Sequence, residues 1–331
     1  MTRPILLYTL LMLVLLALFY AALSVGVATL SPAQVWHGLW QDDGSMESLI
    51  VREIRLPRAV LAVLVGGTLA LSGAALQGYL RNPLAEPGLL GVTNGAALGA
   101  VIALYGGLAT ASSIGLPVAA MVGAVAAVAL TYLLAGRSGS TLVLILAGIA
   151  VSSLFGAGVA VALNLAPNPF AAMEVIFWLM GSLANRTLAQ CALILPFVVL
   201  GWLCLLACAR GLTALTLGEK TAATLGIHLT RLRWQLAVGV ALAVGAVVSV
   251  SGSIGFVGLV VPHLLRPWVR HRPGHLLPAS LLGGASLLLL ADMAVRVIPT
   301  SGMELRLGVV TALLGAPFFL ALLYSERRRR S

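Results

Sequence analysis

Long runs of apolar residues, broken by short charged interruptions, constrain this chain more than any other feature of its sequence. The runs are roughly 17–25 residues long, the length that an α-helix needs to cross about 30 Å of hydrocarbon. Backbone N–H and C=O groups in lipid must be satisfied within the protein, so segments of this kind are expected to be helices. The sequence therefore predicts an all-α polytopic membrane protein.

The amino-acid composition agrees with this prediction. Charged residues make up 9% of the 331 residues and hydrophobic residues 60%, whereas soluble domains are about 25% charged. A net charge of +10 could indicate nucleic-acid binding, but the basic residues are spread among loops and the C-terminal tail, without an aromatic-interleaved patch. We therefore expect a lipid bilayer and no nucleic acid among the partners.

Apolar runs set against charges give ten candidate spans. The first, Ile5–Ala28, is long for the apolar region of a secretory signal and is interpreted as a span. The eighth is short and contains Gly255, Gly258 and Pro262, which predicts a half-span or a steeply tilted helix. The spans lie near residues 5–28, 57–80, 89–106, 115–135, 142–163, 188–208, 234–253, 256–270, 275–297 and 305–324.

The distribution of Lys and Arg predicts the orientation. An even number of spans places both termini on one face, and fourteen of the 20 basic residues fall on that face: Arg3, Arg81, Arg137, Arg210, Lys220, Arg231, Arg233, Arg266, Arg270, Arg272 and Arg327 to Arg330. The other face has six: Arg52, Arg55, Arg58, Arg186, Arg296 and Arg306. Because cytoplasmic loops are enriched in Lys and Arg, both termini are expected in the cytoplasm.

A short polar segment, Leu215–Ile227, interrupts the apolar sequence on the cytoplasmic side. Thr216 and Glu219 have the spacing of a capping box, which predicts a helix from about Leu217, and Gly226 is a typical left-handed helix stop. A helix this short is not stable alone in water, so we interpret it as a docking helix. The alternative is a solvated connection between two spans.

Three arginines on the outer face recur at intervals of three residues, and Pro57 lies among them at the start of the second span. They are Arg52, Arg55 and Arg58, and Arg296 closes the ninth span on the same face. One interpretation is that they reach lipid headgroups at the membrane rim. The other is that they are fixed cations for the carboxylates of a partner, which suit the planar guanidinium group.

Inside the spans, Asp292 is the main charged residue, and Arg296 follows four residues later. This spacing predicts a local ion pair in preference to a proton relay. The scarcity of other intramembrane acids argues against a carrier driven by protons or sodium. Two stripes of small residues predict close helix packing: Gly91, Gly95 and Gly99, and Gly148, Ser152 and Gly156. The cysteines, Cys191, Cys204 and Cys208, are interpreted as small buried hydrophobic residues.

Five motifs in order along the chain resemble those of the FecCD-type permeases, the membrane subunits of ABC importers for iron chelates, haem and cobalamin. The resemblance extends from about residue 50 to the C-terminus and rests on these segments: Arg55-Leu56-Pro57-Arg58; Asn82-Pro83-Leu84-Ala85-Glu86-Pro87-Gly88; Leu217-Gly218-Glu219 with Leu225-Gly226; Gly258-Leu259-Val260-Val261-Pro262-His263-Leu264-Leu265-Arg266; and Gly308-Val309-Val310-Thr311 with Leu314-Gly315-Ala316-Pro317.

The resemblance implies a type II ABC importer permease fold with about ten transmembrane helices per subunit, in a single domain over residues 1–331. It implies a homodimer in the bacterial inner membrane, two cytoplasmic ABC ATPase subunits that bind ATP and Mg, and a periplasmic substrate-binding protein. The chain itself is then not an enzyme and holds no cofactor or metal, because ATP hydrolysis belongs to the ATPase.

The resemblance also assigns roles to residues. The cytoplasmic segment 211–233 would couple to the ATPase through Leu217, Gly218, Glu219, Lys220, Ala222, Leu225 and Gly226. Arg55, Arg58 and Arg296 match positions that meet the binding protein, and the cytoplasmic gate would include Asn82, Leu84, Ser140 and Thr141. Arg306 departs from the family pattern, where proline is common, and residues 325–331 form a basic tail.

Two other functions are considered. A stand-alone ion-driven secondary carrier would work without an ATPase. An intramembrane enzyme is disfavoured, because H-E-x-x-H, G-x-S-x-G and paired intramembrane carboxylates are missing from the sequence. His263 could be imagined as an iron ligand, but it belongs to a motif shared across substrates. Haem, ferric siderophores and cobalamin all remain open as cargo.

Overall fold

The structure is a computed structural model that describes residues 2–26, 28–41, 43–108, 112, 114–136, 141–298 and 304–330. All regular secondary structure in these residues is helical. The helices are α1 (Thr2–Ser24), α2 (Pro32–Trp40), α3 (Met46–Leu49), the π-helix η1 (Ile50–Arg55), α4 (Leu56–Leu80), the 3-10 helix η2 (Pro87–Leu90), α5 (Val92–Tyr105), α7 (Gly115–Ala135), α8 (Thr141–Asn164), α9 (Pro169–Leu179), α10 (Leu188–Ala207), α11 (Ala209–Leu215), α12 (Glu219–Thr224), α13 (Leu229–Ser251), α14 (Val257–Leu265), α15 (Pro273–Val297) and α16 (Leu307–Arg330).

Seven helical segments among the described residues are long and apolar enough to cross a membrane. They contain α1, α4, α7, α8, α10, α13 and α15. Each of the ten predicted positions holds a helix, but α5 is short, at 14 residues. Helix α14 has nine residues, which confirms the prediction that the eighth segment is unusually short.

Helices α2 and α9 were not predicted, although their starts carry recognisable signals. Ser31 and Gln34 form a capping box at α2, with Pro32 in the first turn. Asn168 caps α9 by accepting a hydrogen bond from the backbone N–H of Ala171. Both helices are too short to be found from the length of an apolar run, so the capping residues were their only sequence signal.

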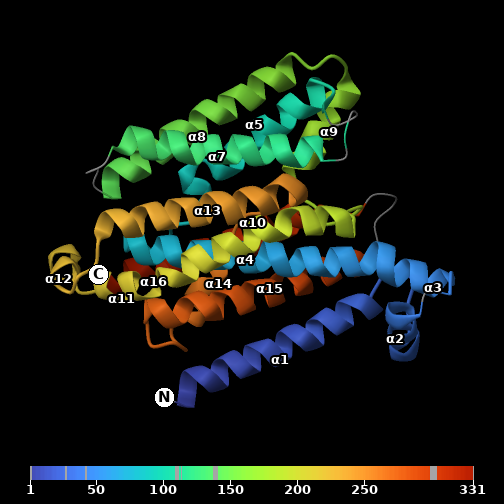
Figure 1. Cartoon of the computed structure of the whole chain (residues 1–331), viewed down its shortest axis with the longest axis horizontal. Helices are drawn as coiled ribbons and strands as arrows, with labels where there is room; N and C mark the ends of the chain where they lie inside the picture. The colour runs from blue at the N-terminus through green and yellow to red at the C-terminus, as the bar shows by residue number, and fades with distance from the viewer. Residues whose placement is uncertain are drawn as a thin grey trace.

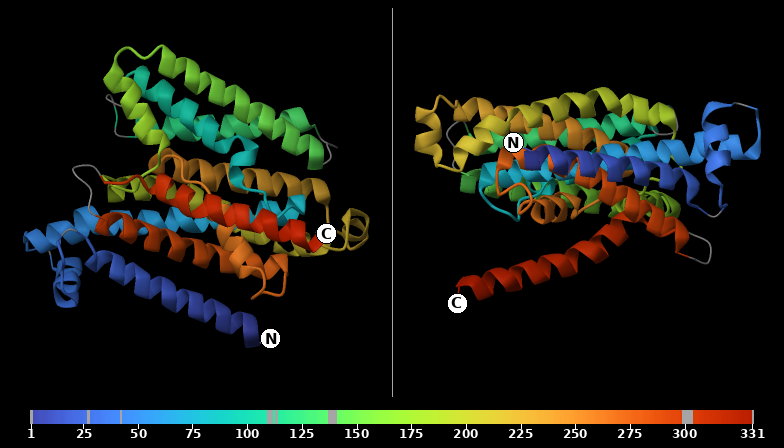
Figure 2. Two further views of the ribbon diagram at one scale, coloured as in Figure 1. Left: turned by 180° about the vertical axis from the view of Figure 1, so that it is seen from behind. Right: turned by 90° about the horizontal axis from the view of Figure 1, so that it is seen from below.

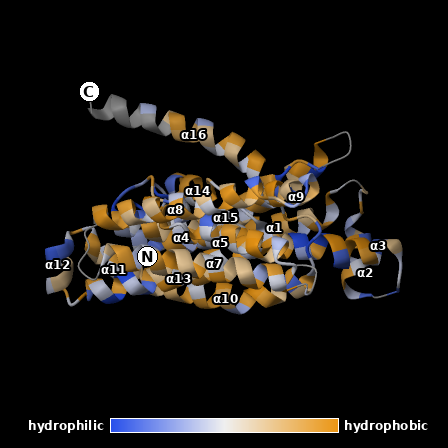
Figure 3. Cartoon of the chain, turned by 90° about the horizontal axis from the view of Figure 1, so that it is seen from above, coloured by the Kyte–Doolittle hydropathy of each residue, from blue (hydrophilic) through white to orange (hydrophobic). Residues whose placement is uncertain are grey.

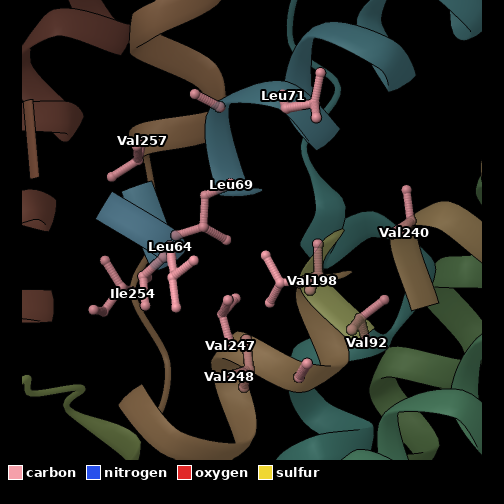
Figure 4. Close-up of a cluster of buried hydrophobic side chains, with 14 of the residues drawn as sticks. Leu64, Leu69, Leu71, Val92, Val198, Val240, Val247, Val248, Ile254 and Val257 are labelled. Carbon is pink, nitrogen blue, oxygen red and sulfur yellow. The ribbon is translucent and has the colours of Figure 1, made fainter. Parts of the chain in front are cut away.

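Helix α4 is the central element of the bundle, with 89% of its most apolar window buried. It packs against α10, α13, α14 and α15, and its neighbours enclose the apolar core drawn in Figure 4. Glycine permits the closest approaches: a methyl group at Gly66 would overlap the carbonyl oxygen of Gly284, and one at Gly73 would overlap that of Gly258. Pro57 lies in the first turn of α4, as predicted.

The two predicted stripes of small residues lie at helix contacts. A side chain at Gly95 or Gly99 would overlap the backbone of α7, and one at Gly148 would overlap the carbonyl oxygen of Leu89. Helices α7 and α8 lie with α5 at one edge of the bundle, and α1 lies at the opposite edge (Figure 1). Small residues therefore set the distances between helices, as the sequence predicted.

Polar residues concentrate at the two ends of the bundle, while its sides are apolar (Figure 3). We call these ends the α12 end, where α11 and α12 lie, and the α2 end, where α2 and α3 lie (Figure 1). Both chain termini lie toward the α12 end, and α16 diverges from the bundle along its length (Figure 2). An arrangement with both termini at one end agrees with an even number of crossings.

Candidate functional site

The segment predicted to dock a partner lies at the α12 end. The expected capping box is wrong, because α12 begins at Glu219, two residues after the predicted start, and has no side-chain cap. The Thr216 hydroxyl instead donates to the Thr213 carbonyl in the last turn of α11. Gly218, with φ +98°, then separates the two helices. Thr216 thus bonds to the preceding helix α11 and does not cap α12.

The predicted stop at Gly226 is confirmed. Gly226 has φ +81°, and the N–H of Ile227 donates to the Ala222 carbonyl at 3.1 Å, as in a Schellman motif. Ala222 is fully buried, whereas Leu217 and Leu225 are 64% and 60% exposed. Helix α12 is therefore anchored by one small residue, and the leucines that flank it in sequence are exposed.

The same end holds the extended connection between α4 and α5. Arg81, with φ +49°, makes an exposed ion pair with Glu219 of α12 at 3.6 Å. Asn82 accepts a hydrogen bond from the backbone N–H of Leu84 at 3.0 Å, which fixes the turn. Of the other two predicted gate residues, Ser140 lies outside the described residues, and Thr141 is the first residue of α8.

A cavity of about 310 Å³ lies where this connection meets the break between α13 and α14. Its lining includes Glu86, Asn94 and Ser253. Phe256, also in the lining, has φ +65°, an uncommon backbone conformation for a bulky residue. The amide of Asn94 donates to the Ser152 carbonyl at 2.9 Å, which joins α5 to α8 beside the cavity. Polar groups thus lie together beside the break between α13 and α14, within an otherwise apolar bundle.

At the α2 end, the predicted arginines form a buried network that we call the arginine cluster: Arg55, Arg58, Asp292, Arg296 and Glu304. Asp292 is fully buried and accepts from the Nε of Arg58 at 2.7 Å and from the Nε of Arg296 at 2.9 Å. Arg58 also pairs with Glu304. The predicted local ion pair between Asp292 and Arg296 is confirmed, and Arg58 shares it.

The remaining donors of the arginine cluster bind the C-terminal end of α1. Arg55 donates to the carbonyls of Leu23 and Ser24 at 2.8 and 2.7 Å. Arg296 donates to the carbonyl of Ala22 at 2.8 Å. Carbonyls at the end of a helix have no partner within it, so the two guanidinium groups take the place of water there.

The burial of these arginines corrects the sequence interpretation. Arg55 and Arg58 are 4% and 7% exposed, and the side chain of Arg296 is 7% exposed. The interpretation that these three reach lipid headgroups is therefore wrong, and none of them is an exposed cation in this structure. Arg52 is partly exposed and donates to the carbonyls of Gly38 and Leu39 at 2.9 and 3.0 Å. The sequence signal for the network was the pairing of Asp292 with Arg296; the participation of Glu304 and of the α1 carbonyls depends on contacts distant in sequence.

Arg306 lies in a second cavity at the junction of α9, the connection that follows it, and the residue before α16. The cavity has a volume of about 240 Å³, and Arg186 also lines it. The guanidinium carbon of Arg306 is 4.8 Å from the centre of the Phe177 ring, in the range of a cation–π contact.

Of the cysteines, Cys191 and Cys208 are buried and Cys204 is partly buried.

A bundle of long helices with apolar sides and two polar ends is the architecture of a multi-pass membrane protein. The chain belongs to the FecCD transport family, whose pattern matches residues 13–325. It is therefore a permease of the ABC importer class.

Individual relatives support this assignment over nearly the whole chain. The hemin transport system permease protein HmuU of Yersinia pestis is 39% identical, covering 98% of this chain and 96% of the relative. The vitamin B12 import system permease protein BtuC of Vibrio cholerae is 42% identical, covering 91% and 88%. A solved metal-chelate type ABC transporter in an inward-facing conformation has a TM-score of 0.85 and 34% identity, covering 97% and 99%.

Proposed function

We propose that this permease imports an iron chelate, either haem or a ferric siderophore, or cobalamin, across the bacterial inner membrane. The supporting observation is helix α12, which is anchored at Ala222 and flanked by the exposed Leu217 and Leu225. The names of HmuU and BtuC favour large metal chelates as the cargo class, whereas a further relative is a molybdate import permease. The chain makes and breaks no bond in its cargo.

On the cytoplasmic side, we propose a homodimer that carries two ABC ATPase subunits, each of which binds ATP and Mg. Leu217, Glu219 and Leu225 of the coupling segment would enter a cleft of the ATPase, so that closure of the ATPase pair moves α12. The ion pair between Arg81 and Glu219 would transmit this movement to the connection that holds Asn82 and Leu84. Ser140 and Thr141 would complete the gate.

On the outer side, we propose that a periplasmic substrate-binding protein docks over the α2 end. The burial of Arg55, Arg58 and Arg296 favours a positioning role, in which they hold α1, α4 and α15 together beneath the docking surface. Glu304 is the accessible edge of the cluster, with a side chain that is 35% exposed. A carboxylate of the binding protein could replace it on Arg58.

The double variant Glu219→Ala with Leu225→Asp tests the coupling role. We expect it to insert normally but to lose stimulation of ATP hydrolysis by cargo-loaded binding protein, and to lose ATP-driven uptake. Thr224→Ala is the matched control, because the Thr224 hydroxyl bonds only to the Thr221 carbonyl within α12. Undiminished uptake by the double variant would refute the proposal.

Cargo and mechanism are tested together in proteoliposomes that contain the chain, its ATPase and its binding protein. Haem, a ferric siderophore and cobalamin are offered in parallel. We expect accumulation of one cargo that requires all three components and ATP. Equal accumulation without the ATPase, driven by an ion gradient, would favour a stand-alone secondary carrier instead.

A further inference from the structure

The cavity that contains Arg186 and Arg306 is held open by backbone contacts between distant segments. The N–H of Gly308 donates to the Gly181 carbonyl at 3.3 Å, and the N–H of Ser182 donates to the Ser251 carbonyl at 2.8 Å. These bonds join the start of α16 and the end of α13 to the connection that carries Arg186. They fix the backbone near the points from which Arg186 and Arg306 extend into the cavity.

The two cations have few acceptors around them. The Nε of Arg186 is buried and has no hydrogen-bond partner, and no ion pair joins either arginine to an acid in the described part of the chain. Glu174 is the acidic residue in the lining. Burial and the nearby charge of Arg306 lower the pKa of the Arg186 guanidinium. Both arginine side chains are partly exposed, but a buried donor such as the Arg186 Nε is costly without an acceptor, so an anion that accepts from it would bind here favourably.

The dimensions and walls of the cavity restrict which anion would fit. At about 240 Å³, it is below the roughly 300–1,000 Å³ of pockets that enclose whole drug-sized ligands. It could take one anionic arm of a larger molecule. Leu104, Leu116 and Trp178 add apolar surface beside the cations, which suits a ligand whose carboxylate is attached to an apolar body.

We propose that Arg186 and Arg306 form a binding subsite for a carboxylate arm of the transported cargo. The inference rests on the proposed import function, and it selects cargo with free carboxylates, such as haem, over cobalamin, whose side chains are amides. A planar guanidinium binds carboxylate with two parallel hydrogen bonds. A surface aspartate or glutamate of the binding protein would offer the charge without an apolar body to cover the leucines.

The first experiment tests the subsite itself on the full chain in nanodiscs, with benzoate as the probe and benzamide as its neutral isostere. We expect benzoate, and not benzamide, to raise the thermal unfolding midpoint. Arg186→Gln and Arg306→Gln should each weaken benzoate binding by about tenfold or more, because a charge-assisted pair is lost. Arg272→Gln, at an exposed arginine of the α12 end, is the control and should respond as the original chain does.

Equal responses to benzoate and benzamide, or an unchanged benzoate response in both variants, would overturn the subsite. Arg306→Gln guards against a folding artefact, because Arg306 is only partly buried and its removal leaves the backbone bonds in place.

The second experiment identifies the source of the carboxylate in the assembled transporter. We expect haem to be taken up, its dimethyl ester to be taken up poorly, and Arg186→Gln to remove this difference while the affinity for unloaded binding protein stays constant. A matching loss of affinity for unloaded binding protein would overturn the assignment to cargo. ATP-driven uptake of cobalamin alone would also overturn the carboxylate subsite, but it would leave the proposed importer function intact. Uptake that does not depend on the ATPase would instead refute the importer function.

Discussion

Individual glycines determine how closely the central helices approach. At Gly73 in α4, an added methyl group would overlap the carbonyl oxygen of Gly258, so backbone meets backbone there and no side chain can adjust. At Gly255, by contrast, an added methyl group would meet no atom within 4 Å. Gly258 is thus part of a close contact between backbones, whereas Gly255, three residues earlier in the sequence, is not.

Gly73→Ala should therefore destabilise the protein by about 1–3 kcal/mol, the usual cost of overpacking, whereas Gly255→Ala should change stability little. Denaturant unfolding of the purified variants in detergent measures both effects. A loss for Gly255→Ala as large as that for Gly73→Ala would contradict the packing described here.

Asp292 is the second residue whose replacement is informative. Asp292→Asn removes the charge that two buried arginines share, and breaking a buried ion pair in this way costs about 3–5 kcal/mol. Glu304→Gln acts at the more exposed edge of the arginine cluster and should cost about 1 kcal/mol or less. The same unfolding measurement separates the two, and similar losses would show that the cluster is not organised around Asp292.

At the scale of elements, the sequence predicted helices well where their length or their stop signal is local. Gly226 ends α12 as predicted, and Pro57 opens α4. The prediction of a capping box was wrong because Thr216 can serve either of two adjacent helices, and its hydroxyl forms a local hydrogen bond with Thr213 of α11. The arginine cluster could not be predicted in full, because its bonds to α1 join residues from 31 to 274 positions apart in the chain.

Gly218 separates α11 from α12, so its replacement should displace α12. Its backbone, with φ +98°, is strained for any residue with a side chain, at a cost of about 1–3 kcal/mol. Gly218→Ala should displace α12 and reduce stimulation of the ATPase, while the spans remain folded. Thr216→Ala should leave stimulation unchanged; a large effect would instead restore the capping box as the determinant of α12.

At the scale of the whole molecule, composition and apolar run length predicted the helical membrane fold, and the motifs predicted the family. The number of crossings is harder to predict from the sequence, because α5 and α14 are shorter than a simple span. Packing against α4 and its neighbours allows short and broken helices within the bundle. Sequence length alone does not contain that information.

The predicted orientation can be measured with single cysteines and a membrane-impermeant maleimide. Lys220→Cys at the α12 end should react only from the cytoplasm, and Asp43→Cys near α2 only from the periplasm. Cys191, Cys204 and Cys208 are first replaced by Ala, because Cys204 is only partly buried, and this cysteine-free chain is the control. Labelling of both sites from the same side would contradict the proposed topology.

The fastening of α1 has a consequence for how the protein is made. Helix α1 is synthesised first, yet the carbonyls at its end are bound by Arg55 and by Arg296, and the bond from Arg296 spans 274 positions of the chain. During translation α1 therefore enters the lipid before α15 is made, and the bond between its Ala22 carbonyl and Arg296 forms only after Arg296 has been synthesised. A chain that ended before Arg296 would lack the bond to the Ala22 carbonyl, so α1 would be less firmly held and more accessible to membrane proteases.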